Sequence, residues 1–514
     1  MTLSKPYKSI RNIAQLKAAG YTPKSIKKEL RDNLIIKLKN KQKIFEGIWG
    51  YEDTVVPDVE TAILSQHNFI LLGLRGQAKT RIARLMVGLL DEYIPIVEGS
   101  ELCDDPLKPI SRYATDLIAK YGEDTPISWL HRDQRYTEKL ATPDVSVADL
   151  IGDADPIKAA SLKLPYSDER VIHYGLVPRS HRQLFVINEL PDLQPRIQVA
   201  LFNILQEGDI QIRGFKMRLP LDIQFIFTAN PEDYTNRGSI VTPLKDRIES
   251  QILTHYPKAI EISKKITLQE AKIDSTQIQS VVIPEILKDI IEQVAFEARQ
   301  SEYVDAKSGV SARLTISALE NLYSYAERRL LITGDLHTTA RMADLWGIIP
   351  AITGKIELVY EGEQEGSGTI AQNLLSKAIK TLFIKYFPDP EKYKKKKTKN
   401  TEQESKSVSP YDTVKEWFGK GNSLDIFMTS NNKTYETELK KVQGLYDLVN
   451  KYHSTANYAD KLFMMEFLLH GIAEYSLISK NRLETGVHFK DLLSSIFNPS
   501  SLHFDDDEDL DMKS

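Results

Sequence analysis

A glycine-containing loop between an apolar run and a helix constrains this chain more than any other feature. Phe69–Leu72 is typical of a buried strand, and the residues after it are Gly73, Leu74, Arg75, Gly76, Gln77, Ala78, Lys79 and Thr80. Apolar residues then recur at helical spacing, at Ile82, Leu85, Met86, Leu89 and Leu90. Backbone N–H groups in such a loop close around phosphate oxygens, and a helix start favours an anion. The pattern predicts a phosphate-binding loop rather than a glycine turn before an ordinary helix.

The last three residues of this loop carry the chemistry of a Walker A motif. Lys79 would reach the β- and γ-phosphates of a nucleotide, and Thr80 would place its hydroxyl on Mg²⁺. Ala78 stands where glycine is common in such loops. Alanine tolerates helical dihedrals. The interpretation therefore requires Ala78 to be helical.

A second apolar run ends in two polar residues. Leu184–Ile187 is followed by Asn188 and Glu189, and the carboxyl end of a parallel strand faces the ligand crevice of an α/β sheet. In a Walker B motif the first polar residue orders the magnesium shell and the glutamate after it activates water. Glu189 fits that role, whereas Asn188 offers an oxygen without the usual negative charge. A strand end with a solvated glutamate, and a nucleotide-binding protein without hydrolysis, are the alternatives.

The order of apolar runs predicts the domain organisation. Strand-like runs, including Ile223–Phe227, alternate with helical stretches as in a three-layer α/β domain with a parallel sheet. The expected parts are an N-terminal helical segment at 1–50, the α/β domain at 51–255, a helical lid at 256–388, a flexible linker at 389–410, a helical C-terminal domain at 411–498 and an acidic tail at 499–514.

The N-terminal segment has a clear helical signature. Thr22 can cap a helix, and Pro23 suits its first position. Apolar residues then recur every four positions, at Ile26, Leu30, Leu34 and Leu38.

Composition limits the classes of function. The net charge of −4 gives no general attraction to nucleic acid or to an anionic membrane. The lysine run at 394–397 favours a solvated tether over a nucleic-acid site. Cys103 is the single cysteine, which excludes an internal disulfide, and the histidines lack metal-ligand spacing. No apolar run approaches the ~20 residues that span a bilayer. We therefore expect a cytoplasmic protein without a membrane partner.

Several further segments resemble the AAA+ motor subunit of magnesium chelatase, which neighbours the MoxR group, over about residues 45–345. The segments are Asp149–Asp153, Glu207–Gly214, Thr228–Pro231, Leu244–Arg247 and Gly309–Arg313. The first lies in an insertion expected at about 140–182, and the second in a hairpin expected at about 207–218. The resemblance implies a three-layer P-loop AAA+ domain followed by an α-helical lid.

The resemblance also assigns roles to three residues. Asn230 would be sensor 1 and orient the attacking water with Glu189, Arg247 would be the arginine finger at a neighbour's γ-phosphate, and Arg313 would be sensor 2. Each has a simpler alternative. Asn230 before Pro231 suits a turn, Arg247 could pair with Asp246, and Arg313 could sit exposed at a helix start.

The function implied by the resemblance is ATP hydrolysis with Mg²⁺ in a ring of identical subunits, expected to be a hexamer. Hydrolysis would drive metal insertion or remodelling of a partner, and the family pairs such motors with a protein bearing a von Willebrand factor A domain. The alternative is a MoxR-like assembly chaperone or scaffold that is gated by nucleotide and has little turnover.

Overall fold

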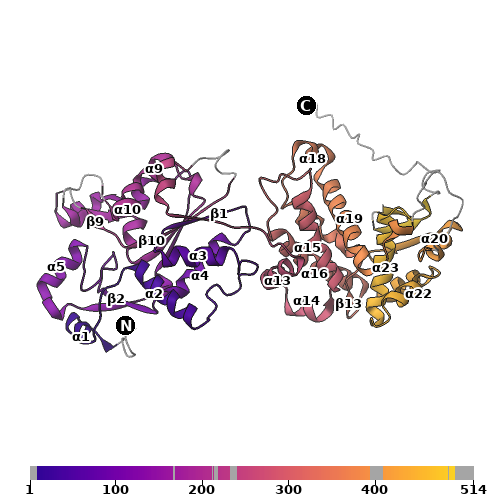
Figure 1. Ribbon diagram of the computed structural model, residues 1–514, viewed down its shortest axis with the longest axis horizontal. Coiled ribbons are helices and arrows are strands. Elements are labelled where there is room, and N and C mark those ends of the chain that lie inside the picture. The colour runs from indigo at the N-terminus through magenta and orange to yellow at the C-terminus, as the bar shows by residue number, and fades with distance from the viewer. Residues whose placement is uncertain are drawn as a thin grey trace. The chain divides into compact units, whose positions relative to one another are not determined.

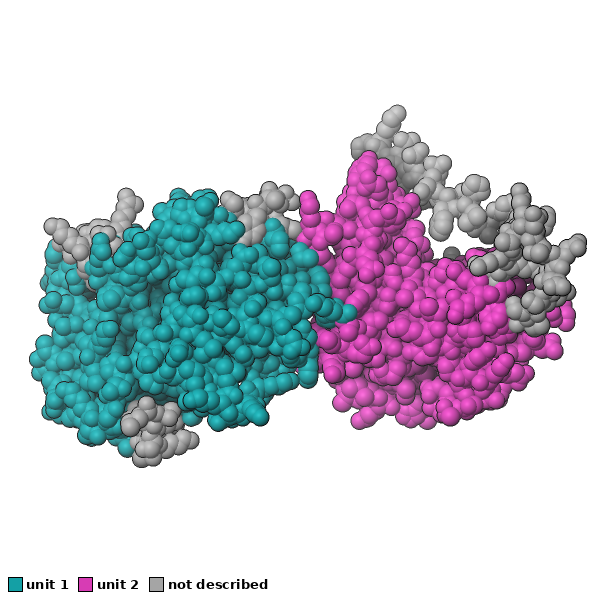
Figure 2. All heavy atoms as spheres, viewed as in Figure 1, with its two compact units in different colours: residues 1–258 teal, residues 259–514 magenta. Residues whose placement is uncertain are grey.

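The computed structural model describes residues 9–165, 168–210, 212, 218–231, 240–393, 409–483 and 485–492. The chain divides into two compact units, Met1–Lys258 and Ala259–Ser514, which Figure 2 shows in teal and magenta. Within the described ranges, no helix combines the length and the apolar character that crossing a membrane requires.

A five-stranded parallel sheet forms the centre of the first unit (Figure 1). Its strands are β1 (Phe69–Leu72), β4 (Tyr136–Leu140), β7 (Gln183–Asn188), β10 (Ile223–Ala229) and β11 (Ser250–Leu253). The spatial order is β11-β1-β10-β7-β4, so the first strand lies between the last two. The three strands predicted from apolar runs are confirmed, and β7 and β10 extend slightly beyond the predicted bounds.

Both faces of the sheet are covered, because its strands alternate apolar side chains between two cores. One core takes Phe69 and Leu71 of β1 together with side chains from α2 (Ile26–Lys39), α3 (Val55–Leu64) and α4 (Lys79–Leu85). The other takes Ile70 of β1 with side chains from α9 (Pro195–Ala200), α10 (Phe202–Glu207) and α12 (Thr242–Arg247). A sheet buried on both faces explains the continuous apolar runs. The predicted three-layer α/β architecture is confirmed.

The N-terminal segment belongs to this first unit. It contains α1 (Ile13–Ala18) and α2, whose Ile26, Leu30 and Leu34 pack into the core below β1. The prediction that Thr22 caps this helix is wrong. Ser25 is the cap, and its Oγ accepts a hydrogen bond from the backbone N–H of Lys28 at 3.3 Å.

The remaining elements of the first unit flank this sheet. They are β2 (Tyr93–Val97), α5 (Arg112–Tyr121), β3 (Ile127–His131), α6 (Val147–Leu150), β5 (Gly152–Ala154), α7 (Pro156–Leu162), β6 (Ile172–Tyr174), α8 (Leu176–Arg179), β8 (Asp209–Ile210) and β9 (Leu219–Pro220). Antiparallel pairing of β5 with β6 falls inside the insertion expected at 140–182, and pairing of β8 with β9 bounds the hairpin expected at 207–218. Residues 211 and 213–217 of that hairpin lie outside the described residues.

The second unit is mainly helical. Its helices are α13 (Ile260–Glu270), α14 (Ser275–Ser280), α15 (Glu285–Gln300), α16 (Arg313–Thr333), α17 (Ile349–Thr353), α18 (Tyr360–Glu365), α19 (Ser367–Tyr386), α20 (Asp412–Gly419), α21 (Asn432–Lys440), α22 (Leu445–Tyr452) and α23 (Tyr458–Glu474). Its strands are β12 (Val281–Val282), β13 (Thr338–Thr339), β14 (Leu424–Phe427), β15 (Ser479–Leu483) and β16 (Gly486–Lys490).

One hydrophobic core runs through this second unit, from Val281 to Phe489. Side chains of both the lid predicted at 256–388 and the domain predicted at 411–498 belong to it. An antiparallel sheet of β14, β16 and β15 also lies here, which the sequence did not predict. Residues 394–408 of the predicted linker, and the whole acidic tail at 499–514, lie outside the described residues.

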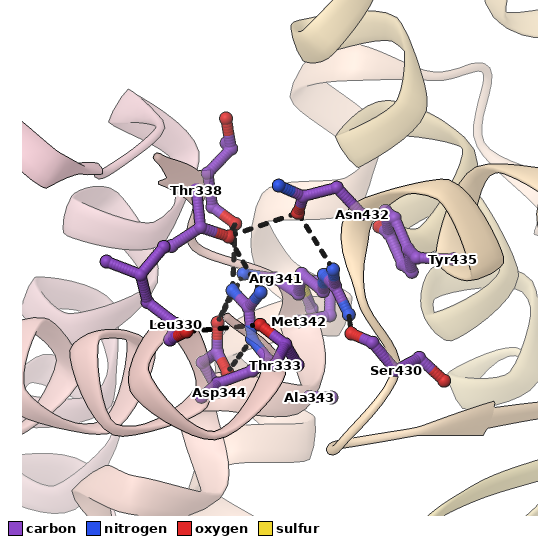
Figure 3. A network of polar contacts seen from close by, with 12 residues as sticks. Leu330, Thr333, Thr338, Arg341, Met342, Ala343, Asp344, Ser430, Asn432 and Tyr435 are labelled. Carbon is purple, nitrogen blue, oxygen red and sulfur yellow. Dashed lines mark hydrogen bonds and ion pairs between the residues drawn. The ribbon is translucent and has the colours of Figure 1, made fainter. Parts of the chain in front are cut away.

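A buried polar network joins the two parts of this core (Figure 3). The guanidinium of Arg329 on α16 donates to both carboxylate oxygens of Asp344, at 3.0 and 2.8 Å, and to Thr338 Oγ1 at 2.7 Å. Arg341 donates to the backbone oxygen of Ser430 at 2.8 Å and to Asn432 Oδ1 at 3.0 Å. Residues more than 80 positions apart in the chain are thereby held together by charge-assisted hydrogen bonds.

Candidate functional site

The candidate site lies where three strands of the parallel sheet end. The phosphate loop follows β1, Asn188 ends β7, and Asn230 follows β10. In the order β11-β1-β10-β7-β4, the chain runs from β1 to β4 on one side and from β10 to β11 on the other, so the connections leave these two neighbouring strands in opposite directions. The carboxyl end of such a strand is the usual ligand crevice of an open α/β sheet.

The start of the phosphate loop is packed too tightly for a side chain. A Cβ on Gly73 would lie 2.0 Å from Thr254 Oγ1 and 2.2 Å from Gln77 Oε1. Those two side chains are hydrogen-bonded to each other at 2.6 Å, and Tyr51 OH donates to the backbone oxygen of Gln77 at 3.0 Å. Burial raises the pKa of Tyr51 to about 12, so it remains a donor. Residues outside the motif therefore fix the shape of the loop, and motif reading alone did not identify them.

The prediction that Ala78 has a helical backbone is wrong. Its backbone has φ 57° and ψ 17°, which is left-handed and not the right-handed helical conformation that we expected. Such a conformation costs an L-residue about 1–2 kcal/mol, because Cβ approaches the following carbonyl oxygen. The loop keeps the backbone path that glycine favours, and alanine adopts it under strain.

Lys79 is the first residue of α4, and its ammonium reaches across the loop. It donates to the backbone oxygens of Gly73 and Leu74, the latter at 3.0 Å. It also donates to Asn230 Oδ1 at 2.7 Å. Residues 151 positions apart, predicted separately as phosphate ligand and sensor 1, are therefore in direct contact.

Asn188 is the centre of a second set of contacts. Its Oδ1 accepts hydrogen bonds from Thr80 Oγ1 at 3.2 Å and from Thr228 Oγ1 at 3.0 Å. Its Nδ2 donates to Glu138 Oε1 at 2.6 Å. The two predicted magnesium ligands, Thr80 and Asn188, thus lie side by side, with a carboxylate behind them.

Glu138 was not identified from the sequence. It lies on the edge strand β4, where polar and apolar residues mix and no apolar run marks the strand. Its Oε2 accepts from Arg84 Nε at 2.9 Å and from Tyr136 OH at 3.0 Å. This carboxylate raises the pKa of Arg84 through that hydrogen bond, while burial, followed by Glu138, raises the pKa of Tyr136.

Glu189 has a backbone conformation that is uncommon for a residue other than glycine. Its backbone is left-handed, with φ 56° and ψ 49°, and it precedes the short 3₁₀ helix Leu190–Asp192. The backbone N–H donates to Thr228 Oγ1 at 3.2 Å. Within the described part of the chain, its carboxylate makes no hydrogen bond or ion pair. Left-handed non-glycine residues concentrate at functional sites, where the surroundings impose the strain.

The two predicted arginines have contacts and surroundings of their own. Arg247 ends α12 and donates to Gln206 Oε1 at 3.0 and 2.7 Å, with its guanidinium over the ring of Phe202. It thus bonds to Gln206 instead of pairing with Asp246. Arg313 is the exposed first residue of α16, in the second unit.

The donor set fits a magnesium–nucleotide complex. A hydroxyl from Thr80, an amide oxygen from Asn188 and the nearby Glu138 are oxygen ligands or supports of the kind that Mg²⁺ prefers, and Lys79 supplies a cation for phosphate. Among the described residues, no group of three or more histidine, cysteine, aspartate or glutamate side chains is arranged to hold a metal.

Comparisons with known proteins give distant similarities. No protein-family model matches the chain. It is 23% identical to the uncharacterised protein YeaC of Bacillus subtilis over 275 residues, which covers 49% of this chain and 79% of YeaC.

Similar solved structures include a complex of the BchI and BchD subunits of magnesium chelatase, at 18% identity and a TM-score of 0.32, covering 62% of this chain and 98% of that one. NtrX from Brucella abortus in complex with ATP is 12% identical with a TM-score of 0.33, covering 57% and 52%. The fold itself rests on the strand order, the loop after β1 and the contacts at the strand ends. These make the first unit a three-layer α/β domain with a glycine-containing loop after its first sheet strand, and a largely helical unit follows it.

Proposed function

We propose that this chain is an ATP hydrolase that works as a ring and resembles the magnesium chelatase motor. The observation that carries the proposal is the contact of Lys79 with Asn230, beside the paired Thr80 and Asn188. The residues proposed as phosphate ligand, water-orienting amide and magnesium ligands lie in direct contact in these two pairs. Glu189 follows Asn188 in the chain, and its carboxylate makes no hydrogen bond or ion pair with the residues that the structure describes.

Each residue has a distinct task in this proposal. Lys79 and the loop N–H groups bind the phosphates, and Thr80 with Asn188 holds Mg²⁺, which when bound neutralises charge on the phosphates. Glu189 accepts a proton from the attacking water, and Asn230 orients that water. Arg313 contacts the nucleotide of its own subunit. An exposed arginine at a helix start gains nothing from the helix dipole, and a bound anion would compensate for that.

Arg247 is proposed to act on a neighbouring subunit. It lies partly exposed at the end of α12, held by one amide and one aromatic ring. An arginine that stabilises transition-state charge contributes about 10³–10⁵ in rate in related NTPases. Ground-state binding depends much less on it. Arg247→Ala should therefore bind ATP nearly normally and hydrolyse it poorly.

Subunit mixing tests the ring. Lys79→Ala destroys the phosphate site and keeps the arginine, while Arg247→Ala does the reverse. Mixed rings should contain some complete sites and regain ATPase activity. Activity that stays absent at every ratio, while light scattering shows mixed rings, would exclude action in trans. Absence of ATP-dependent assembly in the wild type would exclude the ring.

The work done by the ring is proposed from the resemblance. Hydrolysis would drive metal insertion into a substrate or remodelling of a partner, with a von Willebrand factor A domain protein as the expected partner. Pull-down with Glu189→Gln and ATP, which should hold the partner in a stalled complex, tests this. Recovery of no such protein would contradict the partner assignment and leave the ATPase intact.

A MoxR-like chaperone or scaffold with little turnover is the second candidate. Asn188 in place of a carboxylate favours it. A steady-state ATPase assay that compares wild type with Glu189→Gln separates the two, since a scaffold would give the same low rate in both.

A further inference from the structure

Glu138 contacts the side-chain amide of Asn188. The orientation of that amide determines whether an oxygen or an NH₂ group faces Thr80 and the proposed Mg²⁺ site. Asn188 has an oxygen and an NH₂ group at its tip, and a cation is attracted by the first and repelled by the second. An aspartate at this position has no such problem, because both of its tips are oxygens. The substitution in this chain therefore creates a need for something that fixes the amide.

The contacts show what fixes it. Glu138 Oε1 accepts from Asn188 Nδ2 at 2.6 Å, a short charge-assisted hydrogen bond. A carboxylate accepts and cannot donate, so it selects the NH₂ end and turns Oδ1 toward Thr80. Thr228 Oγ1 donates to the same Oδ1 at 3.0 Å and supports that choice from the β10 side.

Glu138 is itself held in place. Arg84 Nε and Tyr136 OH both donate to Oε2, at 2.9 and 3.0 Å, which leaves Oε1 for Asn188. The ion pair with Arg84, whose side chain is 64% exposed, also offsets the charge of Glu138. Orientation of the amide, more than added negative charge, is therefore the effect that this carboxylate can exert.

We propose that Glu138 is a positioning residue for Mg²⁺: it orients Asn188 so that the pair does the work of the usual aspartate. This inference rests on the proposed ATPase function and deepens it. Outer-shell partners that orient metal ligands typically contribute about 10–100-fold in metal affinity.

The test measures Mg²⁺ dependence of nucleotide binding and not only turnover. A fluorescent, non-hydrolysable ATP analogue is bound to the full-length chain, and MgCl₂ is titrated. Glu138→Met, which keeps the side-chain length and removes the acceptor, should raise the half-saturating Mg²⁺ concentration about 10–100-fold. Glu138→Gln has one acceptor oxygen for the three donors Arg84, Tyr136 and Asn188, so its Mg²⁺ midpoint should lie between those of Glu138→Met and wild type. Glu123→Ala is the matched control, since that exposed carboxylate pairs with Lys17 on another part of the unit.

The same Glu138 substitution in an Asn188→Asp variant distinguishes an effect on amide orientation from an effect of the Glu138 charge or of misfolding. In Asn188→Asp both tips are oxygens, so nothing needs to be oriented, and Mg²⁺ should bind at least as tightly as in wild type. In that background an oxygen of the introduced aspartate would face Glu138 Oε1 as a second acceptor, so adding Glu138→Met should not raise the Mg²⁺ midpoint, which makes the two positions strongly coupled. A structural defect would persist in both backgrounds. Glu138→Ala replaces Glu138→Met if the latter does not fold.

The outcomes are distinct. An unchanged Mg²⁺ midpoint in Glu138→Met overturns the inference, and so does an equal loss in the wild-type and Asn188→Asp backgrounds, because charge or folding would then explain it. Wild type that binds no nucleotide at any Mg²⁺ concentration overturns the proposed function first, and this inference with it.

Discussion

Two polar networks, one in each unit, differ in how completely they are closed. In the second unit, Arg329 and Asp344 are almost wholly buried, and each nitrogen of that guanidinium donates to a partner at 2.7–3.0 Å. In the first unit, Asn188 and Asn230 are nearly as buried, at 8% exposure each. Their partners Lys79 and Thr80, however, reach toward the surface. The network around Arg329 is buried. The network around Asn188 includes two partly exposed side chains, Lys79 and Thr80.

Backbone strain separates the two networks in the same way. Ala78, which precedes Lys79, and Glu189, which follows Asn188, both have left-handed backbones. No described non-glycine residue of the Arg329 network has a positive φ. A closed network stabilises a fold without backbone strain, whereas left-handed residues beside Lys79 and Asn188 are what the proposed function would lead us to expect. Mutations should therefore affect function in the first network and stability in the second.

The largest difference between the effect on activity and the effect on stability is expected for Glu189→Gln. The amide keeps the shape of the side chain and loses the base, so ATP turnover should fall about 10²–10⁴-fold. The free energy of unfolding should change by less than about 0.5 kcal/mol, as for other surface substitutions. Turnover and urea denaturation of the same preparation check both halves. Near-normal turnover would move the catalytic role to another residue.

Asp344→Ala should lower stability and leave nucleotide binding unchanged. It leaves the Arg329 guanidinium buried and unpaired, which costs about 3–5 kcal/mol. Hydrogen exchange at the amides of α16 should report this loss, with ATP-analogue binding to the first unit retained. Arg329→Met combined with Asp344→Leu removes both charges and should recover most of the stability. If the double variant is as unstable as the single one, packing and not an unpaired charge is responsible.

Acid sensitivity of the second unit should depend on His470. This side chain is buried, and neither ring nitrogen has a hydrogen-bond partner among the described residues; Glu466 Oε1 lies 3.9 Å away. Burial lowers the pKa of His470 well below its usual value, and the positive charge of Lys480 lowers it further. The unfolded chain therefore takes up a proton below about pH 6.5 that the folded chain refuses.

Stability should consequently be level above pH 7 and fall on acidification, with a contribution from His470 approaching about 1.4 kcal/mol per pH unit. His470→Leu should remove that part of the slope, measured by urea unfolding at pH 7.0, 6.0 and 5.0. His181 in the first unit, whose pKa burial lowers to about 3, should keep its own contribution in this variant. Identical slopes in wild type and variant would show that His470 is protonated in the folded state.

The smallest effect is expected for Ala78→Gly. Glycine adopts the left-handed backbone without strain, and after its greater freedom in the unfolded chain is counted, the first unit should gain about 1 kcal/mol. Its melting temperature without nucleotide should rise by about 2–4 °C. Ala83→Gly on the same helix is the control, and it should lower stability because that residue is buried and helical. A destabilised Ala78→Gly would show that the methyl group packs usefully.

The sequence allowed the central sheet to be predicted because its strands are buried on both faces. Phe69–Leu72 was placed without error, and Asn188 at the end of β7 and Asn230 directly after β10 were predicted as site residues. The edge strand β4 is partly exposed and lacks an apolar run, so Glu138 was missed.

The conformation of Ala78 was also misjudged, because the backbone there follows from the packing around Gly73 and not from the preference of alanine. Local patterns identify which residues meet at strand ends. They do not identify the side chains from neighbouring strands that hold those residues in position.

The position of β1 in the sheet has a consequence for how the protein is made. β1 pairs only with β10 and β11, so Phe69 has no sheet neighbour until residues 226 and 250 have been synthesised. The lysine of the phosphate loop likewise waits for Asn230, and Gly73 for Thr254. A nascent chain that stops before the end of the first unit would therefore lack the phosphate loop's supports. Under the proposed function, nucleotide should bind only after the ribosome has released the whole of the first unit.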